Sequence, residues 1–401
     1  IDPGFAQAYA RLADASLLAD DRGVSDPLAR AAEAADYADK ALALSPDSAE
    51  ALAAKAFIEH DAGRPRAAID YAARAIRANP NYVPGYKRLA SALSTTGRLT
   101  EALAVYEAAR AIDPLNRNIL ASIANLLLNT GKLDAAERAA TANNQIYPHL
   151  SDLVLAGVFY TRGDIPEAHR LLKGLEAGSP SSGELNFLWR LYANVGLTEL
   201  ATTYTDSWDE KAYGALVAGD RAAALALAEA NADDRSAYWQ GPGWVAYVAG
   251  DHATAYRIFR GDFDNIYDRE NPVIGAFRTG PAIAMLAEFE RAGDPDAAIV
   301  RTALAKFFDG KALDDFPYDN QISGAAWKAL NGDADGAIAW LAACADRGLA
   351  FTQAGFLPEF DLLRIRPDFI AIAKKMDENA ARHRAAIEAQ LASPGPEWVV
   401  R

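Results

Sequence analysis

Four acidic residues in one short stretch come near to the spacing of a calcium-binding loop: Asp262, Asp264, Asp268 and Glu270. A loop of that kind needs a further oxygen ligand between them and a glycine at its sharp turn. This sequence has Ile266 and Tyr267 at those two places. We therefore predict a solvated acidic loop here, and we expect no bound metal.

Other residues with chemical potential are isolated from one another. The single cysteine, Cys344, lies 12 residues after Gly332, at a small-residue position of a helix, and is predicted to pack rather than to react. No phosphate-binding glycine loop and no nucleophile elbow occurs. The five histidines stand singly, without metal-ligand spacing, and most are expected at the surface or in turns: His60, His149, His169, His252 and His383. The sequence thus predicts no catalytic residue, no cofactor and no metal.

Composition excludes several partners. The 401 residues carry 40 Lys and Arg against 54 Asp and Glu, which gives a net charge of −14. Nucleic acid and anionic lipid surfaces select for an excess of basic residues, so neither is expected as a partner. No apolar run reaches the length of about 18 residues that a membrane-spanning helix needs, so no membrane insertion is expected. Alanine is abundant, and it is the strongest helix former, so the chain is predicted to be all-helical.

A 34-residue spacing organises the first part of the chain. Prolines recur at that interval at Pro46, Pro80, Pro114 and Pro148, and glycines recur at the same interval at Gly63, Gly97 and Gly131. Each of these glycines follows a proline by 17 residues, so every unit divides into two halves. This pattern predicts two helices per repeat, with glycine in the turn between them and proline after the second helix.

The glycine signal continues after the prolines stop. An alanine follows five residues after each of nine glycines, namely Ala68, Ala102, Ala136, Ala168, Ala201, Ala224, Ala255, Ala298 and Ala337. A small side chain there lets the two helices of a hairpin cross closely. An aspartate follows the glycine directly in five repeats, where it is placed to cap the second helix: Asp164, Asp220, Asp251, Asp294 and Asp333.

These residues resemble the tetratricopeptide repeat (TPR). One unit fills every characteristic place of that pattern, with Tyr86, Leu89, Ala90, Ala102, Tyr106, Ala109 and Pro114. The resemblance implies an all-α fold, a right-handed superhelical solenoid of antiparallel helix hairpins with a C-terminal capping helix. We expect a regular array over 1–148, degenerate hairpins over 149–345, and the capping helix and tail over 346–401. In the capping helix, a polar outer face is expected from Lys374, Lys375, Arg382 and Arg384.

Short motifs at both ends suggest a narrower likeness. The first residues, Ile1-Asp2-Pro3, repeat Ile112-Asp113-Pro114, so the chain is expected to begin inside a repeat of a longer protein. Three segments are similar to the TPR region of bacterial signalling proteins that carry a winged-helix or adenylate/guanylate cyclase domain, namely Asn79-Pro80-Asn81-Tyr82, Ile112-Asp113-Pro114-Leu115 and Leu362–Phe369. This likeness implies a sensory or interaction module in the cytoplasm, or in the periplasm if a membrane anchor precedes it. The alternative is the C-terminal part of an enzyme, a nucleotide cyclase or transferase, with its catalytic domain upstream.

The resemblance also implies where a protein or peptide would bind. First helices of TPR hairpins line a concave groove, and the positions that point into it are filled here by Lys87, Ser91, Asn118, Asn125 and Asn129. The three amides share one helix face and can clamp a peptide backbone, or they simply make that face soluble. Lys87 alone does not complete the carboxylate-binding set of chaperone-binding TPRs. The aromatic residues between Trp208 and Phe259 either fill the core of irregular repeats or form an interface. Among them Trp239 and Trp244 are expected to be exposed and to contact a partner, or a second copy of the chain, in a self-associating array.

Overall fold

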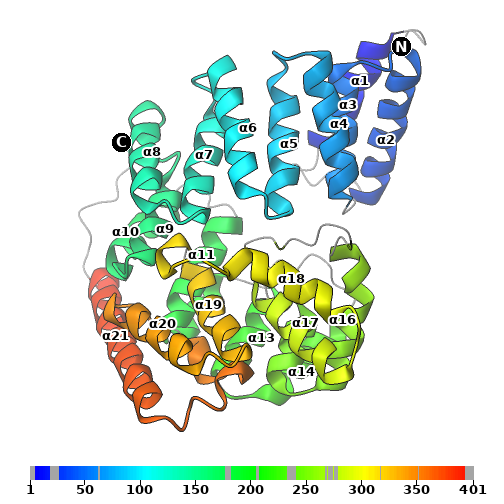
Figure 1. The fold of residues 1–401 in the computed structure, drawn as a ribbon. Coiled ribbons are helices and arrows are strands. Elements are labelled where there is room, and N and C mark those ends of the chain that lie inside the picture. Colours follow the sequence, from blue (N-terminus) through cyan, green and yellow to red (C-terminus); the bar gives the residue numbers. More distant parts are fainter. Residues whose placement is uncertain are drawn as a thin grey trace. The chain divides into compact units, whose positions relative to one another are not determined.

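The computed structural model describes residues 5–18, 27–61, 64–176, 182–204, 207–232, 241–266, 269, 274, 279–316, 318–350 and 352–392. Throughout these ranges the regular structure is helical, as the sequence predicts (Figure 1). No helix among them is long and apolar enough to cross a membrane. The chain forms two compact units, Ile1–Leu126 (unit 1) and Leu127–Arg401 (unit 2), and each is described by itself.

Unit 1 is a stack of helix hairpins. Its first helices are α1 (Ala6–Leu18), α3 (Ala49–Asp61), α5 (Val83–Thr95) and α7 (Arg117–Asn129), the last of which runs across the unit boundary. Its second helices are α2 (Pro27–Leu44), α4 (Pro65–Ala78) and α6 (Leu99–Ile112). Alanine dominates the buried clusters of α1 to α4, together with Leu52 and Ile58. Small side chains of this kind let neighbouring helices pack closely.

Unit 2 begins with α8 (Leu133–Ile146) and continues with six hairpins. Their first helices are α9 (Asp152–Thr161), α11 (Ser182–Asn194), α13 (Trp208–Val217), α15 (Pro242–Ala249), α17 (Thr279–Ala292) and α19 (Tyr318–Leu330). Their second helices are α10 (Ile165–Glu176), α12 (Thr198–Ala201), α14 (Arg221–Ala230), α16 (His252–Ile266), α18 (Ala297–Phe308) and α20 (Ala334–Asp346). The described residues also form four short 3₁₀ helices, η2 (Thr202–Tyr204), η4 (Leu313–Asp315), η5 (Thr352–Gly355) and η6 (Pro358–Phe360). Helix α21 (Pro367–Ala392) ends the described chain.

The predicted glycine turns and alanine crossings are present in both units. Eight of the turn glycines have φ between 68° and 93°, the left-handed region that glycine adopts without strain, and Gly63 lies outside the described residues. Eight of the nine alanines are buried. The exception is Ala298, which is exposed. Pro295 and the turn around it delay the start of α18 to Ala297, so Val300 takes the buried place instead.

Four of the five predicted aspartate caps are confirmed. Asp164, Asp220, Asp251 and Asp333 each accept a hydrogen bond from a backbone N–H three residues ahead, at 2.9 to 3.3 Å. Asp294 instead accepts from the backbone N–H of Asp296, because the second helix starts later in that hairpin.

The solenoid of unit 2 closes on itself. First helices α13, α15, α17 and α19 pack in succession, and α19 then contacts α9, the first helix of the first hairpin. The α9–α10 turn approaches the end of α20 so closely that a Cβ on Gly163 would lie 1.9 Å from the carbonyl oxygen of Arg347. The last helix, α21, lies against both α20 and α10. Unit 2 is therefore a closed ring of hairpins.

Two histidines and one arginine take part in this closure. His169 is buried on α10, with Nε2 2.9 Å from the hydroxyl of Tyr192, and its other ring nitrogen meets Gln390 of α21. His383 of α21 is buried with Nε2 2.7 Å from the carbonyl oxygen of Gly348. Arg384 donates from Nε to the carbonyl oxygen of Val195 at 2.8 Å. The expectations of surface histidines and of Arg384 on a polar outer face are thus wrong for these three residues.

Candidate functional site

In unit 1 the first helices form the inner side of the stack. α1 packs directly on α3 and α3 on α5, whereas the second helices are set farther apart. A stack with this difference curves toward its first helices, which then present an extended concave surface. We take the face of α3 and α5 on that side as the candidate site.

Lys87 is the most unusual residue of this face. Its side chain is half-buried, and burial together with the positive charge of Arg88 lowers the pKa of its ammonium group. No carboxylate among the described residues forms an ion pair with Lys87, although the chain has 54 acidic residues. A half-buried ammonium group close to a second positive charge is a place where a carboxylate from a ligand would be favourable.

Arg88 is held in place by an aromatic ring. Its guanidinium carbon lies 4.2 Å from the centre of the Phe57 ring on α3, a cation–π arrangement that fixes the orientation of the planar group. Nearby, His60 Nε2 lies 3.2 Å from the hydroxyl of Thr95, which links α3 and α5 a second time. Sequence analysis missed Arg88. Phe57 lies 34 residues before the predicted groove residue Ser91, so an aromatic ring on the inner face of the preceding repeat was a signal for a cation here.

The other predicted groove residues lie on two helices. Ser91 is half-buried one turn after Lys87 on α5. Asn118 and Asn125 are exposed on α7, and Asn129 is half-buried at the end of the same helix, on the unit 2 side of the boundary. Their role in binding stays a prediction.

The two predicted contact tryptophans are not an exposed pair. Trp239 lies outside the described residues. Trp244 is only 4% exposed and belongs to the core of unit 2, so the expectation of its exposure is wrong. Every residue of α15 from Pro242 to Val248 is buried, and a helix that is apolar all round belongs in an interior. That pattern, Pro-Gly-Trp-Val-Ala-Tyr-Val, was the signal that could have placed Trp244.

Reactive chemistry finds no support among the described residues. They contain no group of three or more His, Cys, Asp or Glu side chains that could hold a metal ion. Of the four acidic residues in the predicted loop, Asp262 and Asp264 lie within α16, so the expectation of a loop is wrong for these two. Asp268 and Glu270 lie outside the described part of the chain. Cys344 is fully buried, as predicted, and burial raises the pKa of its thiol to about 12.

One buried carboxyl group was not foreseen. Glu210 at the start of α13 is 6% exposed, and its Oε1 accepts a hydrogen bond of 2.5 Å from Asn186 on α11. Its Oε2 is buried without a hydrogen-bond partner. Burial raises the pKa of Glu210 to about 7. No sequence signal marks this residue, because acidic residues in the first turn of a helix are common and mostly exposed.

No family model matches this sequence, and no curated protein is similar to it in sequence. Among solved structures, a TPR protein of Thermus thermophilus is 21% identical, with a TM-score of 0.40, over 47% of this chain and 100% of its own. The pilF protein of Pseudomonas aeruginosa is 18% identical, with a TM-score of 0.38, over 57% of this chain and 90% of its own. A tetratricopeptide repeat protein of Parabacteroides merdae is 16% identical, with a TM-score of 0.36, over 66% of this chain and 95% of its own.

These three similarities are low. The resemblance to TPR proteins rests on the chain's own hairpins, with their left-handed glycines and buried alanines, which bear out the sequence pattern.

Proposed function

We propose that unit 1 binds a carboxylate of an extended peptide on the inner face of α3 and α5, and that the chain is a non-enzymatic protein-binding scaffold. The observation that carries this proposal is Lys87, half-buried beside Arg88 without a carboxylate partner among the described residues. A carboxylate supplied by a ligand lies favourably beside the half-buried ammonium group of Lys87. Arg88, whose guanidinium group lies over the Phe57 ring, adds a second positive charge close to this group.

The charge of the two units supports this location. Unit 1 has 14 Lys and Arg against 16 Asp and Glu, a net charge of −2, whereas the remaining 26 and 38 give unit 2 a net charge of −12. An acidic peptide is therefore repelled less by unit 1 than by unit 2. The exposed amides of Asn118 and Asn125 follow on α7, and they suit the backbone of a peptide that continues along the stack.

Short sequence motifs support a wider role. Ile112-Asp113-Pro114 and the segment Leu362–Phe369 are similar to the TPR regions of bacterial signalling proteins. We place the chain in that context as a sensory or interaction module, in which peptide capture by unit 1 is the binding step.

Selection from a random peptide library displayed on phage, with the full chain immobilised, tests the proposal. We expect enrichment of peptides with acidic side chains or a free carboxyl end, and affinities that fall with added salt. In fluorescence polarisation, Lys87→Met is expected to weaken the best peptide about tenfold, because a charge-assisted hydrogen bond is lost. Lys132→Met, at an exposed lysine in the α7–α8 turn, is the control and should bind as the unchanged chain does. Equal affinities for both variants contradict the proposal.

A further inference from the structure

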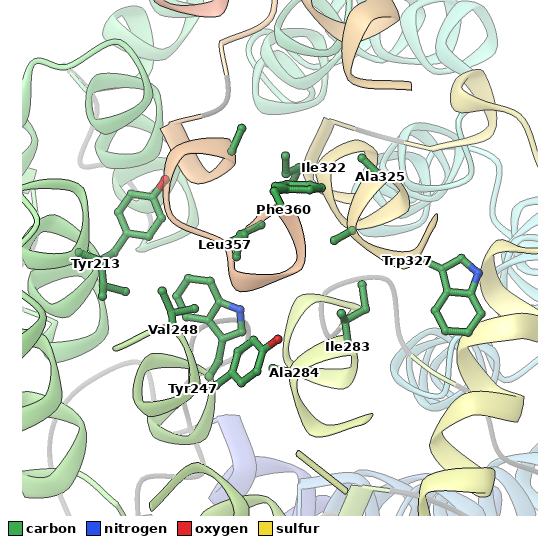
Figure 2. Packing of buried hydrophobic residues seen from close by; sticks show 14 of the residues in the cluster. Tyr213, Tyr247, Val248, Ile283, Ala284, Ile322, Ala325, Trp327, Leu357 and Phe360 are labelled. Atoms are coloured by element: carbon green, nitrogen blue, oxygen red, sulfur yellow. The ribbon is translucent and has the colours of Figure 1, made fainter. Parts of the chain in front are cut away.

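The interior of the unit 2 ring is filled by a segment that belongs to none of the six hairpins. After α20 the chain turns back, and residues 352–364 run through η5 and η6 along the inner sides of the first helices. Four of its residues, spaced three apart, are buried: Ala354, Leu357, Phe360 and Leu363. Figure 2 shows Leu357 and Phe360 among Tyr247 and Val248 of α15, Ile283 and Ala284 of α17, and Ile322 and Ala325 of α19.

Polar groups of the ring also bind this segment. The hydroxyl of Thr352 donates to Asn194 Oδ1 at 3.2 Å and lies 3.0 Å from the hydroxyl of Tyr213. Tyr247 donates from its hydroxyl to Oε1 of Glu359 at 3.1 Å. The segment therefore meets α11, α13 and α15 through hydrogen bonds and α15, α17 and α19 through its apolar residues. This is the face on which an open stack of such hairpins binds its ligands.

Two polar atoms of the segment lack hydrogen bonds, which is rare in protein interiors. Oε2 of Glu359 and Nε of Arg364 are both buried without a hydrogen-bond partner. More than nine in ten buried polar groups of native proteins form a hydrogen bond. Two buried atoms without one, within six residues, show that the segment is incompletely hydrogen-bonded inside the ring. Each weakens the hold of the ring on this segment.

We infer that the ring of unit 2 is a second peptide-binding channel, occupied by the chain's own residues 352–364 and able to take a separate peptide with the same Leu-x-x-Phe-x-x-Leu spacing. This inference stands apart from the proposed function of unit 1, because it uses different helices and apolar rather than charged contacts. It also assigns a regulatory role to the segment, since a peptide of this kind can enter only when the segment withdraws.

Glu359 makes occupation of the empty channel sensitive to pH. Burial raises the pKa of its carboxyl group to about 7, and the charges around it are Asp361 and Arg364 of its own segment and, beyond Tyr247, Glu288 and Arg291 of α17. A peptide that enters the channel must bury this carboxyl group again. When the internal segment has already left the channel, the affinity of such a peptide is therefore highest at acidic pH, where the group is neutral, and falls as pH rises toward the raised pKa. When the two segments exchange, the proton that one releases is taken up by the other.

The test uses the full chain and a fluorescein-labelled peptide with the sequence from Ala350 to Arg366. In the double variant Leu357→Ala/Phe360→Ala the internal segment loses its two central anchors. We expect this variant to bind the peptide at least about tenfold more tightly than the unchanged chain does. It should also prefer the peptide by the same factor over a control peptide in which the same two residues are alanine. Equal binding of the two peptides, or no saturable binding, overturns the inference.

The test also works if the double variant is partly unfolded. If its helical circular dichroism is reduced, the labelled peptide is expected to restore the signal and the control peptide is not. Failure of both peptides to restore it overturns the inference. A second arm compares the peptide with its Glu359→Gln form, which cannot ionise. In the double variant, whose own segment no longer fills the channel, the former should lose affinity at least about fivefold from pH 6 to pH 8 while the latter stays constant. Equal pH profiles contradict the role given to Glu359.

Discussion

Unit 1 and unit 2 are built from the same hairpin, yet one remains an open stack and the other closes into a ring. Both have left-handed glycines in their turns and buried alanines at their helix crossings. They differ in what lies on the inner side. In unit 1 the buried clusters of α1 to α4 consist mainly of alanine, whereas unit 2 has one continuous cluster rich in Tyr, Phe and Trp. Glycines in the turns and alanines at the helix crossings thus specify the hairpin. The size of the other buried side chains differs between the open stack of unit 1 and the closed ring of unit 2.

This difference has an energetic side. An alanine contributes little apolar area when it is buried, so each hairpin of unit 1 depends chiefly on its immediate neighbours. In unit 2, contacts between the first and last hairpins join distant parts of the sequence, and the ring is expected to unfold as one body. All seven tryptophans lie after residue 127. Tryptophan fluorescence therefore reports on unit 2 alone, while circular dichroism reports on both units.

The largest expected effect separates the two units. Phe360→Ala removes a fully buried ring from the centre of unit 2 and should cost about 3–5 kcal/mol of unfolding free energy. Urea unfolding followed by tryptophan fluorescence measures it. The matched variant Leu93→Ala, at a buried position of α5 in unit 1, should leave that fluorescence transition in place. An equal shift in both variants contradicts independent unfolding of the units.

Closure of the ring is tested next. Gly163→Ala combines a left-handed backbone with a Cβ that would meet the Arg347 carbonyl oxygen at 1.9 Å, so the turn must separate from α20. We expect a loss of about 3 kcal/mol. Gly219→Ala has a similar φ of 78° with nothing within 4 Å of the added carbon, and it should cost only about 1 kcal/mol. Similar losses in the two variants, measured by thermal unfolding, would show that the close approach contributes nothing.

The buried alanines at the helix crossings, which both units share, are tested by replacing them with a larger residue. Ala102→Leu in unit 1 and Ala337→Leu in unit 2 overfill buried helix crossings and should each cost about 1–3 kcal/mol. Ala298→Leu is the control, because that alanine is exposed and the change should stay within about 0.5 kcal/mol. Denaturant midpoints provide the comparison. A large effect at Ala298 is incompatible with the shifted start of α18.

The smallest expected effect concerns pH. The raised pKa of Glu210 means that the folded state holds this proton more tightly than the unfolded chain, whose value is 4.5. Its contribution to stability is present below that value and is lost as pH rises to about 7. Glu210→Gln should therefore stabilise unit 2 by about 1 kcal/mol at pH 8 and hardly at all at pH 5.

Unit 1 provides the contrast for this pH dependence. A hydrogen bond from Arg98 lowers the pKa of Glu101, so the contribution of Glu101 is lost only at acidic pH. Thermal unfolding at pH 5 and pH 8 measures both cases. A constant effect of Glu210→Gln at the two values would contradict the raised pKa.

Local features were predictable from the sequence, and distant ones were not. Glycine, alanine and proline at fixed intervals specify turns and crossings within about ten residues of each other, and the hairpins follow from them. Ala298 escaped the rule because Pro295 shifts a helix start by two residues, an effect of backbone geometry rather than of spacing. Closure of the ring depends on Gly163 meeting Arg347, and no periodicity in the sequence connects these two residues.

The candidate site also has features that the sequence predicts and features that it does not. The position of Lys87 on a first helix followed from the repeat, but its burial and the stacking of Arg88 on Phe57 are tertiary properties. Trp244 was predicted to be exposed but is buried, because aromatic residues are common in both interfaces and interiors. Only the apolar surroundings of α15 distinguish the two cases.

The burial of Cys344 has a practical consequence for studying motion in this protein. It is the single thiol of the chain, lies at 0% exposure on α20, and has a raised pKa that suppresses its reaction with alkylating reagents. A reagent added under native conditions therefore modifies the protein only at moments when the ring is open around α20. The rate of that modification therefore measures how often the ring opens, and no labelling site has to be introduced.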